Sequence, residues 1–253
     1  MNTKRPIVLI IFALFVSACG SVPVSTEPPL PTNTVLPPTP AVPPTSTPIP
    51  PTTTPEFQQY YTEEFDHDLK YWPAFVVDGR QSVIAKDGLA SAVLAAEAGW
   101  FKFDLQRTQL WAYATYDPFD YEDVRVDARV ENQGTNNNNI SLICRYSKEG
   151  GWYEFNIANN GLFWIYYALP RVDGYVGYKL LAEGGSNAIK QGLDVNEYTI
   201  VCQDNTLTLF INDKLTREIQ DTSLNSGKVG VSVSSFVNLP VIVSFDWVQI
   251  SEP

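Results

Sequence analysis

The chain has 253 residues, of which 28 are acidic and 17 are basic, giving a formal net charge of −11 with a single histidine. This acidity disfavours nucleic acid and anionic lipid surfaces as partners, because both repel a negatively charged protein. One histidine is also too few for the Cys₂His₂ ligand set of structural zinc sites. At this length the chain has room for one or two domains.

Residues 1–19 have the pattern of an export signal. Two basic residues precede an apolar run from Ile7 to Val16, which at about ten residues is too short to span a membrane. The sequence Val16-Ser17-Ala18-Cys19 then resembles the lipobox of bacterial lipoproteins, in which the cysteine is lipidated and becomes the first residue of the mature protein. An ordinary signal peptide with an incidental cysteine is the alternative. The resemblance implies lipidation of Cys19 and attachment to the extracytoplasmic face of the cell membrane through that anchor only.

Residues 20–55 form a predicted linker. Proline and threonine make up most of this segment. Proline removes backbone donors, and little apolar surface remains to offset the chain entropy lost on folding. The segment is therefore expected to be a disordered, semi-extended tether that carries the remaining residues, 56–253.

From residue 56 onward the sequence is typical of short β-strands, because runs of β-branched and aromatic residues alternate with polar ones and are separated by Gly, Asn and Asp. The predicted strands are, in chain order, Tyr60–Phe65, Gly88–Ala95, Trp100–Asp104, Leu110–Thr115, Asp123–Glu131, Ile140–Ser147, Trp152–Ala158, Leu162–Ala168, Tyr178–Ala182, Tyr198–Gln203, Thr206–Asn212, Leu215–Ile219, Lys228–Ser235 and Val241–Ile250. No segment shows sustained helical periodicity. Residues 56–253 are therefore expected to form one all-β domain, a sandwich of two sheets.

Two hairpins have predicted registers. Asn160-Gly161 is typical of a two-residue type I′ turn between the strands on either side of it. A four-residue loop at Lys148–Gly151 would place Arg145 opposite Glu154. Since side chains alternate across a strand, these registers divide the aromatic stretch that ends at Tyr167 into two faces. A two-residue error in a register would leave the division unchanged, whereas a one-residue error would reverse it.

One face is predicted to belong to the core, and the other mixes rings with polar groups. The core face holds Leu142, Cys144, Tyr146, Tyr153, Phe155, Ile157, Leu162, Trp164 and Tyr166. The mixed face holds Ser141, Ile143, Arg145, Trp152, Glu154, Asn156, Phe163, Ile165 and Tyr167. The mixed face suits a ligand site, unless the segment Pro170–Gly192 covers it and makes its rings structural.

Cys144 and Cys202 are the two cysteines other than Cys19. Each is in phase with the apolar residues of its predicted strand, so both thiols are expected to point into the core. An even pair of cysteines in an exported protein permits a disulfide between them. Two buried free thiols are the alternative.

Four turn-and-strand patterns carry a resemblance to a known superfamily. They are Glu64-Phe65-Asp66 before Trp72; Cys144-Arg145-Tyr146 followed by Trp152-Tyr153 and Asn160-Gly161; Cys202 with Asn205–Asp213; and Ser226–Gly230 with Phe245-Asp246-Trp247. In them the region from Phe65 to Ile250 resembles the concanavalin A-like lectin/glucanase superfamily, most closely the laminin G-like and 3-keto-disaccharide-hydrolase-like domains of bacterial surface lipoproteins. The resemblance implies a jelly roll of two curved antiparallel sheets whose concave face often binds glycans, and it leaves the activity open.

Glycoside hydrolysis needs two carboxylates across one cleft, about 5 to 9.5 Å apart. The glucanase branch of the superfamily places them on one strand, as Glu-x-Asp-x-x-Glu or Glu-x-Asp-x-Glu. The nearest approach in this chain is Asp123, Asp127 and Glu131, which are spaced four residues apart with Arg125 and Arg129 between them. This pattern predicts an outer, ion-paired strand face and no catalytic pair.

The predicted function is a surface-anchored, non-catalytic module that binds carbohydrate or polysaccharide, since rings stack on sugars and polar groups bind their hydroxyls. The candidate binding residues are Arg145, Trp152, Glu154, Asn156, Phe163 and Tyr167. A glycoside hydrolase-like enzyme and a structural or protein-adhesion module are the two alternatives. Laminin G-like domains can hold calcium, and the candidate oxygen ligands Asn136–Asn139, Asp173 and Asp194 have no recognisable spacing, so no metal or other cofactor is assigned.

Overall fold

The computed structural model describes residues 57–85, 88–135 and 137–253. The predicted signal segment 1–19, with its lipidation site Cys19, and the predicted linker 20–55 lie outside the described residues. Within these ranges, no helix is long and apolar enough to cross a membrane.

The described residues are almost entirely β-structure. The strands are β1 (Tyr61–Glu63), β2 (Ala74–Asp78), β3 (Val83–Ile84), β4 (Ala92–Glu97), β5 (Trp100–Leu105), β6 (Leu110–Tyr121), β7 (Val124–Asn132), β8 (Asn138–Ser147), β9 (Gly151–Ala158), β10 (Leu162–Pro170), β11 (Val176–Gly185), β12 (Val195–Gln203), β13 (Thr206–Ile211), β14 (Lys214–Gln220), β15 (Gly227–Ser235) and β16 (Val241–Ser251). The alternation that predicted them is visible in β7, where Val124, Val126 and Val130 are buried while Arg125 and Arg129 stay partly exposed.

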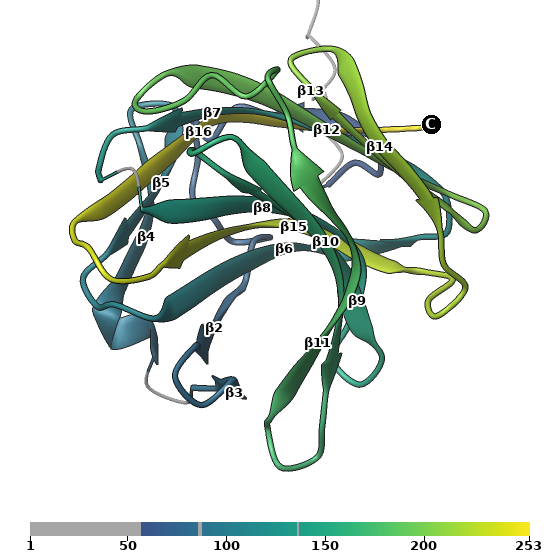
Figure 1. The fold of residues 1–253 in the computed structure, drawn as a ribbon, viewed down its shortest axis with the longest axis horizontal. Coiled ribbons are helices and arrows are strands. Elements are labelled where there is room, and N and C mark those ends of the chain that lie inside the picture. The colour runs from purple at the N-terminus through teal and green to yellow at the C-terminus, as the bar shows by residue number, and fades with distance from the viewer. Residues whose placement is uncertain (1–56, 86–87, 136) are drawn as a thin grey trace, which may run out of the picture. The chain divides into compact units, whose positions relative to one another are not determined.

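The strands form two eight-stranded sheets that pack face to face (Figure 1). Sheet A has the order β14-β13-β12-β7-β16-β5-β4, with β1 also paired to β16. Sheet B has the order β11-β10-β9-β8-β15-β6-β2-β3. Neighbouring strands in both sheets are antiparallel. The predicted fold class, an all-β jelly-roll sandwich of two curved antiparallel sheets, is confirmed.

The strand prediction was wrong in the first third of the domain. It missed β2 and β3, which are short and lie among turn residues. It also took Gly88–Ala95 as one strand, whereas Gly88–Ser91 form a 3-10 turn and β4 follows it. The first error matters for the candidate site, because β2 and β3 form one edge of sheet B.

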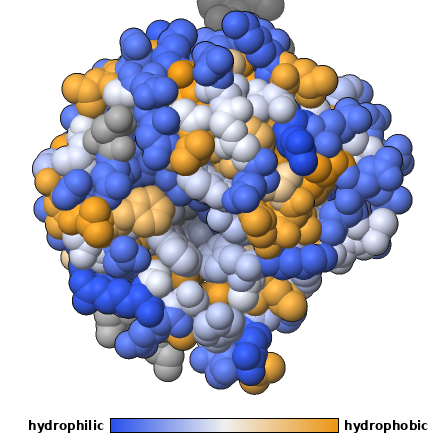
Figure 2. Space-filling view, in the orientation of Figure 1, coloured by the Kyte–Doolittle hydropathy of each residue, from blue (hydrophilic) through white to orange (hydrophobic). Residues whose placement is uncertain are grey.

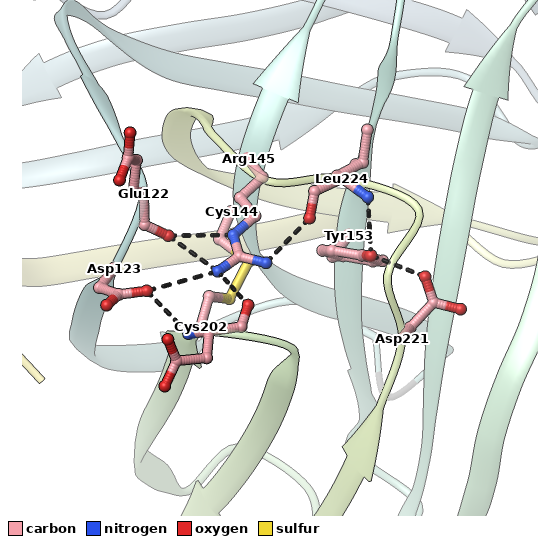
Figure 3. The surroundings of a disulfide bond; sticks show 9 residues. Glu122, Asp123, Cys144, Arg145, Tyr153, Cys202, Asp221 and Leu224 are labelled. Carbon is pink, nitrogen blue, oxygen red and sulfur yellow. Dashed lines mark hydrogen bonds and ion pairs between the residues drawn. A yellow bond between two sulfur atoms is a disulfide. The ribbon is translucent and has the colours of Figure 1, made fainter.

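The apolar core lies between sheets A and B. Phe101, Phe103 and Phe245 of sheet A and Tyr153 and Phe155 of sheet B are buried in it. A disulfide joins Cys144 of β8 to Cys202 of β12, with their Cα atoms 6.8 Å apart, and so links one sheet to the other (Figure 3). The predicted pairing is confirmed, and the alternative of two free thiols is excluded.

A second apolar cluster lies on the opposite, concave face of sheet B. Tyr113 and Trp152 are fully buried there, and Phe75, Tyr146 and Tyr178 pack against them. The ring centroids of Phe75 and Tyr113 are 4.7 Å apart, and those of Tyr146 and Trp152 are 5.6 Å apart. These five residues, called the ring cluster below, fill part of the concave face with closely packed side chains.

The predicted register between β9 and β10 was wrong by one residue. A two-residue Asn160-Gly161 turn would pair residue 159 with Leu162, but Phe163 pairs with Ile157. A type I′ turn needs two residues with positive φ, and here Gly161 has positive φ (96°) while Asn160 does not. A one-residue shift moves every side chain of β10 to the other face.

This shift changes which rings of β10 face the concave side. Phe163 and Tyr167, predicted on the mixed face with Glu154, instead pack in or against the core between the sheets. Trp164 and Tyr166, predicted in the core, pair with Asn156 and Glu154 and lie on the concave side.

The predicted register between β8 and β9 was also wrong. Ile143, and not Arg145, pairs with Glu154, and the pairing shifts again between Cys144 and Ser147. Arg145 sits in this irregular stretch with a φ of 54°. A bulge of this kind re-aims the side chains that follow it. Arg145 consequently leaves the face of Glu154, and Tyr146, predicted in the core, joins the ring cluster.

Candidate functional site

A pocket of about 320 Å³ opens on the concave face of sheet B, beside the ring cluster. Figure 2 shows a hollow near the centre of the face in view, bordered by pale residues of intermediate hydropathy. The residues that line the pocket are Trp111 on β6, Asn139 on β8, Glu154 and Asn156 on β9, Tyr166 on β10, Val176 and Tyr178 on β11, Ser234 on β15, and Ser82, Tyr175 and Phe236 outside the strands. The curve of the sheet therefore places side chains from six strands around one space.

Glu154 is a lining residue with only 2% of its surface exposed. Its Oε2 accepts hydrogen bonds from the Tyr113 hydroxyl at 2.9 Å and from Trp152 Nε1 at 3.1 Å. Its Oε1 accepts hydrogen bonds from Ser141 Oγ at 3.0 Å and from Asn156 Nδ2 at 3.1 Å. These four donors occupy the lone-pair positions of the carboxylate, so Glu154 acts as an internal anchor of the pocket floor.

Two tyrosines extend this network. The hydroxyl oxygens of Tyr178 and Tyr113 are 3.0 Å apart, and because Tyr113 gives its proton to Glu154, Tyr178 must donate to Tyr113. Burial, followed by the nearby Glu154 charge, raises the pKa of both hydroxyls well above the ordinary value for tyrosine. Both therefore remain hydrogen-bond donors at neutral pH.

Asn156 presents an acceptor that no described residue satisfies. Its Nδ2 donates to Glu154 Oε1 and to Ser141 Oγ, each at 3.1 Å, which fixes the orientation of the amide. Its Oδ1 is buried and accepts no hydrogen bond from the described residues. Such an unpaired buried acceptor is unfavourable by about 1–3 kcal/mol. A hydroxyl group of a ligand in the pocket would provide the missing donor.

Half-buried rings border the pocket and continue beyond it. Tyr166 and Phe236 line both the pocket and an adjoining hollow of about 360 Å³, which adds Trp164. The pocket and this hollow together are called the trough below. Trp111 lies against Gly79, where an added Cβ would come within 2.9 Å of the indole ring, so glycine at this position allows the ring to take its place.

Three of the six predicted binding residues lie on the concave side of sheet B. Glu154 and Asn156 line the pocket. Trp152 is fully buried, does not line the pocket and belongs to the ring cluster. The segment Pro170–Gly192 includes Tyr178, whose ring packs against Trp152. This segment therefore covers Trp152, as the structural alternative predicted, but it leaves the trough beside Trp152 open.

Arg145 lies at the end of the sandwich, beside the disulfide (Figure 3). Its guanidinium donates two hydrogen bonds to the Glu122 carbonyl at 2.8 and 3.0 Å, one to the Asp204 carbonyl at 2.8 Å and one to the Leu224 carbonyl at 2.9 Å. Its Nη2 also lies 3.6 Å from the carboxylate of Asp123. The prediction that Arg145 stands beside Glu154 was therefore wrong, and the side chain instead holds three connecting loops together.

The acidic strand that came nearest to a catalytic pattern is an ion-paired outer face, as predicted. Arg125 bonds Asp127, and Arg129 pairs with Asp246 and Glu197. In the described parts of the chain, no group of three or more His, Cys, Asp or Glu side chains is placed to hold a metal ion.

Three of the candidate calcium ligands, Asn137, Asn138 and Asp173, have protein partners. The side-chain oxygen of Asn137 accepts a hydrogen bond from the Val237 backbone N–H at 3.0 Å. The amide nitrogen of Asn138 donates to Asn132 and to the Thr135 carbonyl, and its oxygen accepts from Asn159. Asp173 accepts a hydrogen bond from the Tyr175 backbone. Asn136 lies outside the described residues.

The prediction missed the residues that form most of the trough wall. Trp111 lies within a predicted strand, but nothing in that strand showed that its side chain would lie near β9. Trp164 and Tyr166 would have been found with the correct turn at Gly161. Tyr178 was included in the predicted strand Tyr178–Ala182, but nothing in that strand showed which face of the sheet it would join.

No family model matches the chain, and no curated protein sequence matches it. Solved structures do match. A β-1,3-1,4-glucanase (lichenase) derived from a mouse hindgut metagenome has a TM-score of 0.54 at 12% identity, over 78% of this chain and 100% of the other. A glycoside hydrolase family 16 endo-glucanase from Bacteroides ovatus has 0.53 at 10% identity, over 76% and 99%. The β-glucanase of Bacillus licheniformis has 0.52 at 11% identity, over 78% and 99%. At these identities the likeness is one of fold, the concanavalin A-like jelly roll, and it does not transfer an activity.

Proposed function

We propose that this protein is a non-catalytic, carbohydrate-binding module whose trough takes a carbohydrate or polysaccharide. The observation that carries the proposal is the buried, unpaired Oδ1 of Asn156 in a pocket bordered by half-buried rings. A sugar supplies both complements, because its hydroxyls donate hydrogen bonds and the apolar face of its ring stacks on aromatic side chains. The fold shared with solved glucanases supports the same class of ligand.

The chemistry of the pocket favours binding without hydrolysis. Glu154 is the single acidic side chain among the described residues that line it. Hydrolysis needs a second carboxylate about 5 to 9.5 Å away. The oxygens of Glu154 are also occupied by four donors of the protein, so the group is not placed to exchange a proton with a substrate. In this proposal Glu154 is a positioning residue that orients the amide of Asn156.

Replacing Trp164 by alanine is expected to weaken binding of the best ligand on a glycan array at least tenfold, which corresponds to about 1.4 kcal/mol. The reason is the loss of a half-buried ring from the wall of the trough. Asn156→Ala is expected to weaken binding by a similar factor, because it removes the free acceptor. The measurement is array binding by the full chain, followed by a titration with the best glycan.

Trp247→Ala is the matched control for these variants. Trp247 is also half-buried, but it belongs to β16 of sheet A and lines a different hollow. Its replacement should leave glycan binding unchanged. A parent chain that binds no glycan on the array would refute the proposed function, and unchanged binding by Trp164→Ala would refute the proposed site.

We also propose that Cys19 carries the lipid anchor that holds the domain at the extracytoplasmic face of the membrane. The disulfide supports export, since such bonds persist in oxidising compartments. In a bacterial host, Cys19→Ser is expected to move the chain from the membrane pellet to the soluble fraction, whereas Ser21→Ala should leave it in the pellet. A Cys19→Ser chain that remains in the pellet would contradict the anchor.

A further inference from the structure

We infer that the trough receives the end of a glycan chain and excludes an internal stretch. The inference rests on the proposed carbohydrate function and adds which part of the glycan is bound. It depends on how sheet B closes around the pocket, on what fills the space behind the pocket, and on the size of the pocket.

The two edges of sheet B are joined by hydrogen bonds. β11 is one edge strand and β3 is the other. Val83 of β3 forms an antiparallel bridge with Tyr175, just before β11. The Ile84 backbone N–H donates to the Gly174 carbonyl at 2.9 Å, and the Val176 N–H donates to the Ser82 carbonyl at 2.6 Å. Figure 1 shows β2 and β3 bending out of the sheet towards the turn of the β10–β11 hairpin.

This junction forms part of the pocket wall. Ser82, Tyr175 and Val176 of the junction line the pocket together with Trp111 on β6 and Tyr166 on β10. A sheet whose edges meet encloses its concave side, as in a small barrel. An extended glycan chain that crosses an open concave face continues beyond the face at both of its sides. Here the junction stands in the path of such a chain.

The space behind the pocket is filled. Tyr113 and Trp152 of the ring cluster are fully buried, and so are Val77, Ile143 and Ala168 on the same face. The ring centroids of Tyr113 and Trp152 are 5.3 Å apart, which leaves no passage for a sugar between them. The pocket is thus blind at the ring cluster and continues in the other direction into the hollow beside Trp164.

The size of the pocket agrees with a chain end. At about 320 Å³ it is close to the lower limit of ligand pockets, which measure about 300–1,000 Å³. A terminal unit has one glycosidic bond, so it can enter end-on while the rest of the chain leaves past Trp164. An internal unit has two such bonds and would need a second exit. The free hydroxyls of the terminal unit supply the donor that Asn156 Oδ1 lacks.

The test is the binding stoichiometry on linear chains of different length. The probes are unbranched oligomers of β-1,3-glucan, β-1,4-xylan, inulin and amylose, with unbranched oligomers of any further polysaccharide that the array identifies, each separated into short and long fractions. Calorimetric titration of the full chain is expected to give one protein per glycan chain at every length, with a Kd per chain that changes less than twofold. A number of proteins per chain that rises with length would overturn the inference and leave the carbohydrate proposal standing. Binding to none of the probes would overturn the carbohydrate proposal itself, and the inference with it.

A pair of variants tests the junction directly. Ile84→Pro removes the N–H that bonds the Gly174 carbonyl, whereas Ile84→Val keeps it. Ile84→Pro is expected to weaken binding of the short fraction at least tenfold, and Ile84→Val should bind like the parent. Unchanged binding by a folded Ile84→Pro chain would show that the junction does not shape the pocket. Should Ile84→Pro fail to fold, the stoichiometry of the parent chain still decides the inference.

Discussion

Replacing Arg145 by methionine is expected to lower the free energy of unfolding by about 3–5 kcal/mol. Only 1% of this side chain is exposed, and its guanidinium bonds the carbonyls of Glu122, Asp204 and Leu224. Methionine has a similar length but no donor, so three carbonyls would lose their partner, and each unpaired buried group is unfavourable by about 1–3 kcal/mol. Equilibrium unfolding of the full chain in urea measures the difference.

Two further variants make the result specific. Arg145→Lys keeps the charge but not the planar fork that reaches several carbonyls at once, so its stability should fall between those of the parent and Arg145→Met. Arg171→Met is the matched control, because 65% of the Arg171 side chain is exposed and its ion pair with Asp173 is on the surface. It should change stability by less than about 1 kcal/mol. If the free energy of unfolding of Arg145→Met lies within about 1 kcal/mol of the parent value, the anchoring role of Arg145 is contradicted.

The direction of the Arg145 side chain could not be predicted from the sequence. Regular alternation puts Arg145 on the opposite face from Cys144, and so on the face of Glu154. The bulge that breaks this alternation fits a second irregularity in the neighbouring strand, at Gly227. An added Cβ on Gly227 would lie 2.6 Å from the carbonyl carbon of Arg145, so only glycine permits the approach. Two irregularities that depend on each other across strands leave no signal in either strand alone.

The trough divides into a part that the sequence predicts and a part that it does not. Trp152, Glu154 and Asn156 were correctly placed on one face of β9, because alternation within a strand needs no information about its neighbours. The side on which Trp164 and Tyr166 appear depends on the turn at Gly161, and a difference of one residue there reversed it.

The closure of the pocket could not be predicted from the sequence. It depends on Val83 of β3 meeting Tyr175, two residues that are distant in sequence. β3 is only two residues long, so it carries almost no strand signal of its own. The all-β fold was predictable because many strands support it, whereas the shape of the trough depends on a few contacts between edges.

Removing the disulfide by the double replacement Cys144→Ala/Cys202→Ala is expected to lower the free energy of unfolding by about 4 kcal/mol in the chain-entropy model. The two cysteines are 58 residues apart in sequence, and the bond joins sheet B to sheet A. Without it, the unfolded chain gains the freedom of that loop. Alanine is the better replacement because both positions are fully buried, and serine would bury an additional hydroxyl at each. Urea unfolding of the parent chain with and without reductant gives an independent value for the same bond.

The disulfide and Arg145 are expected to be energetically coupled, since Cys144 and Arg145 are adjacent and both hold the same end of the sandwich (Figure 3). The loss from Arg145→Met should therefore differ by at least about 0.5 kcal/mol between the disulfide-bonded chain and the Cys144→Ala/Cys202→Ala chain. The loss from Arg171→Met should be the same in both backgrounds. Additive losses for Arg145→Met would show that the loops remain in place without the bond, and that the disulfide acts only on the unfolded chain. A coupled loss would show that the bond also positions the carbonyls that Arg145 binds.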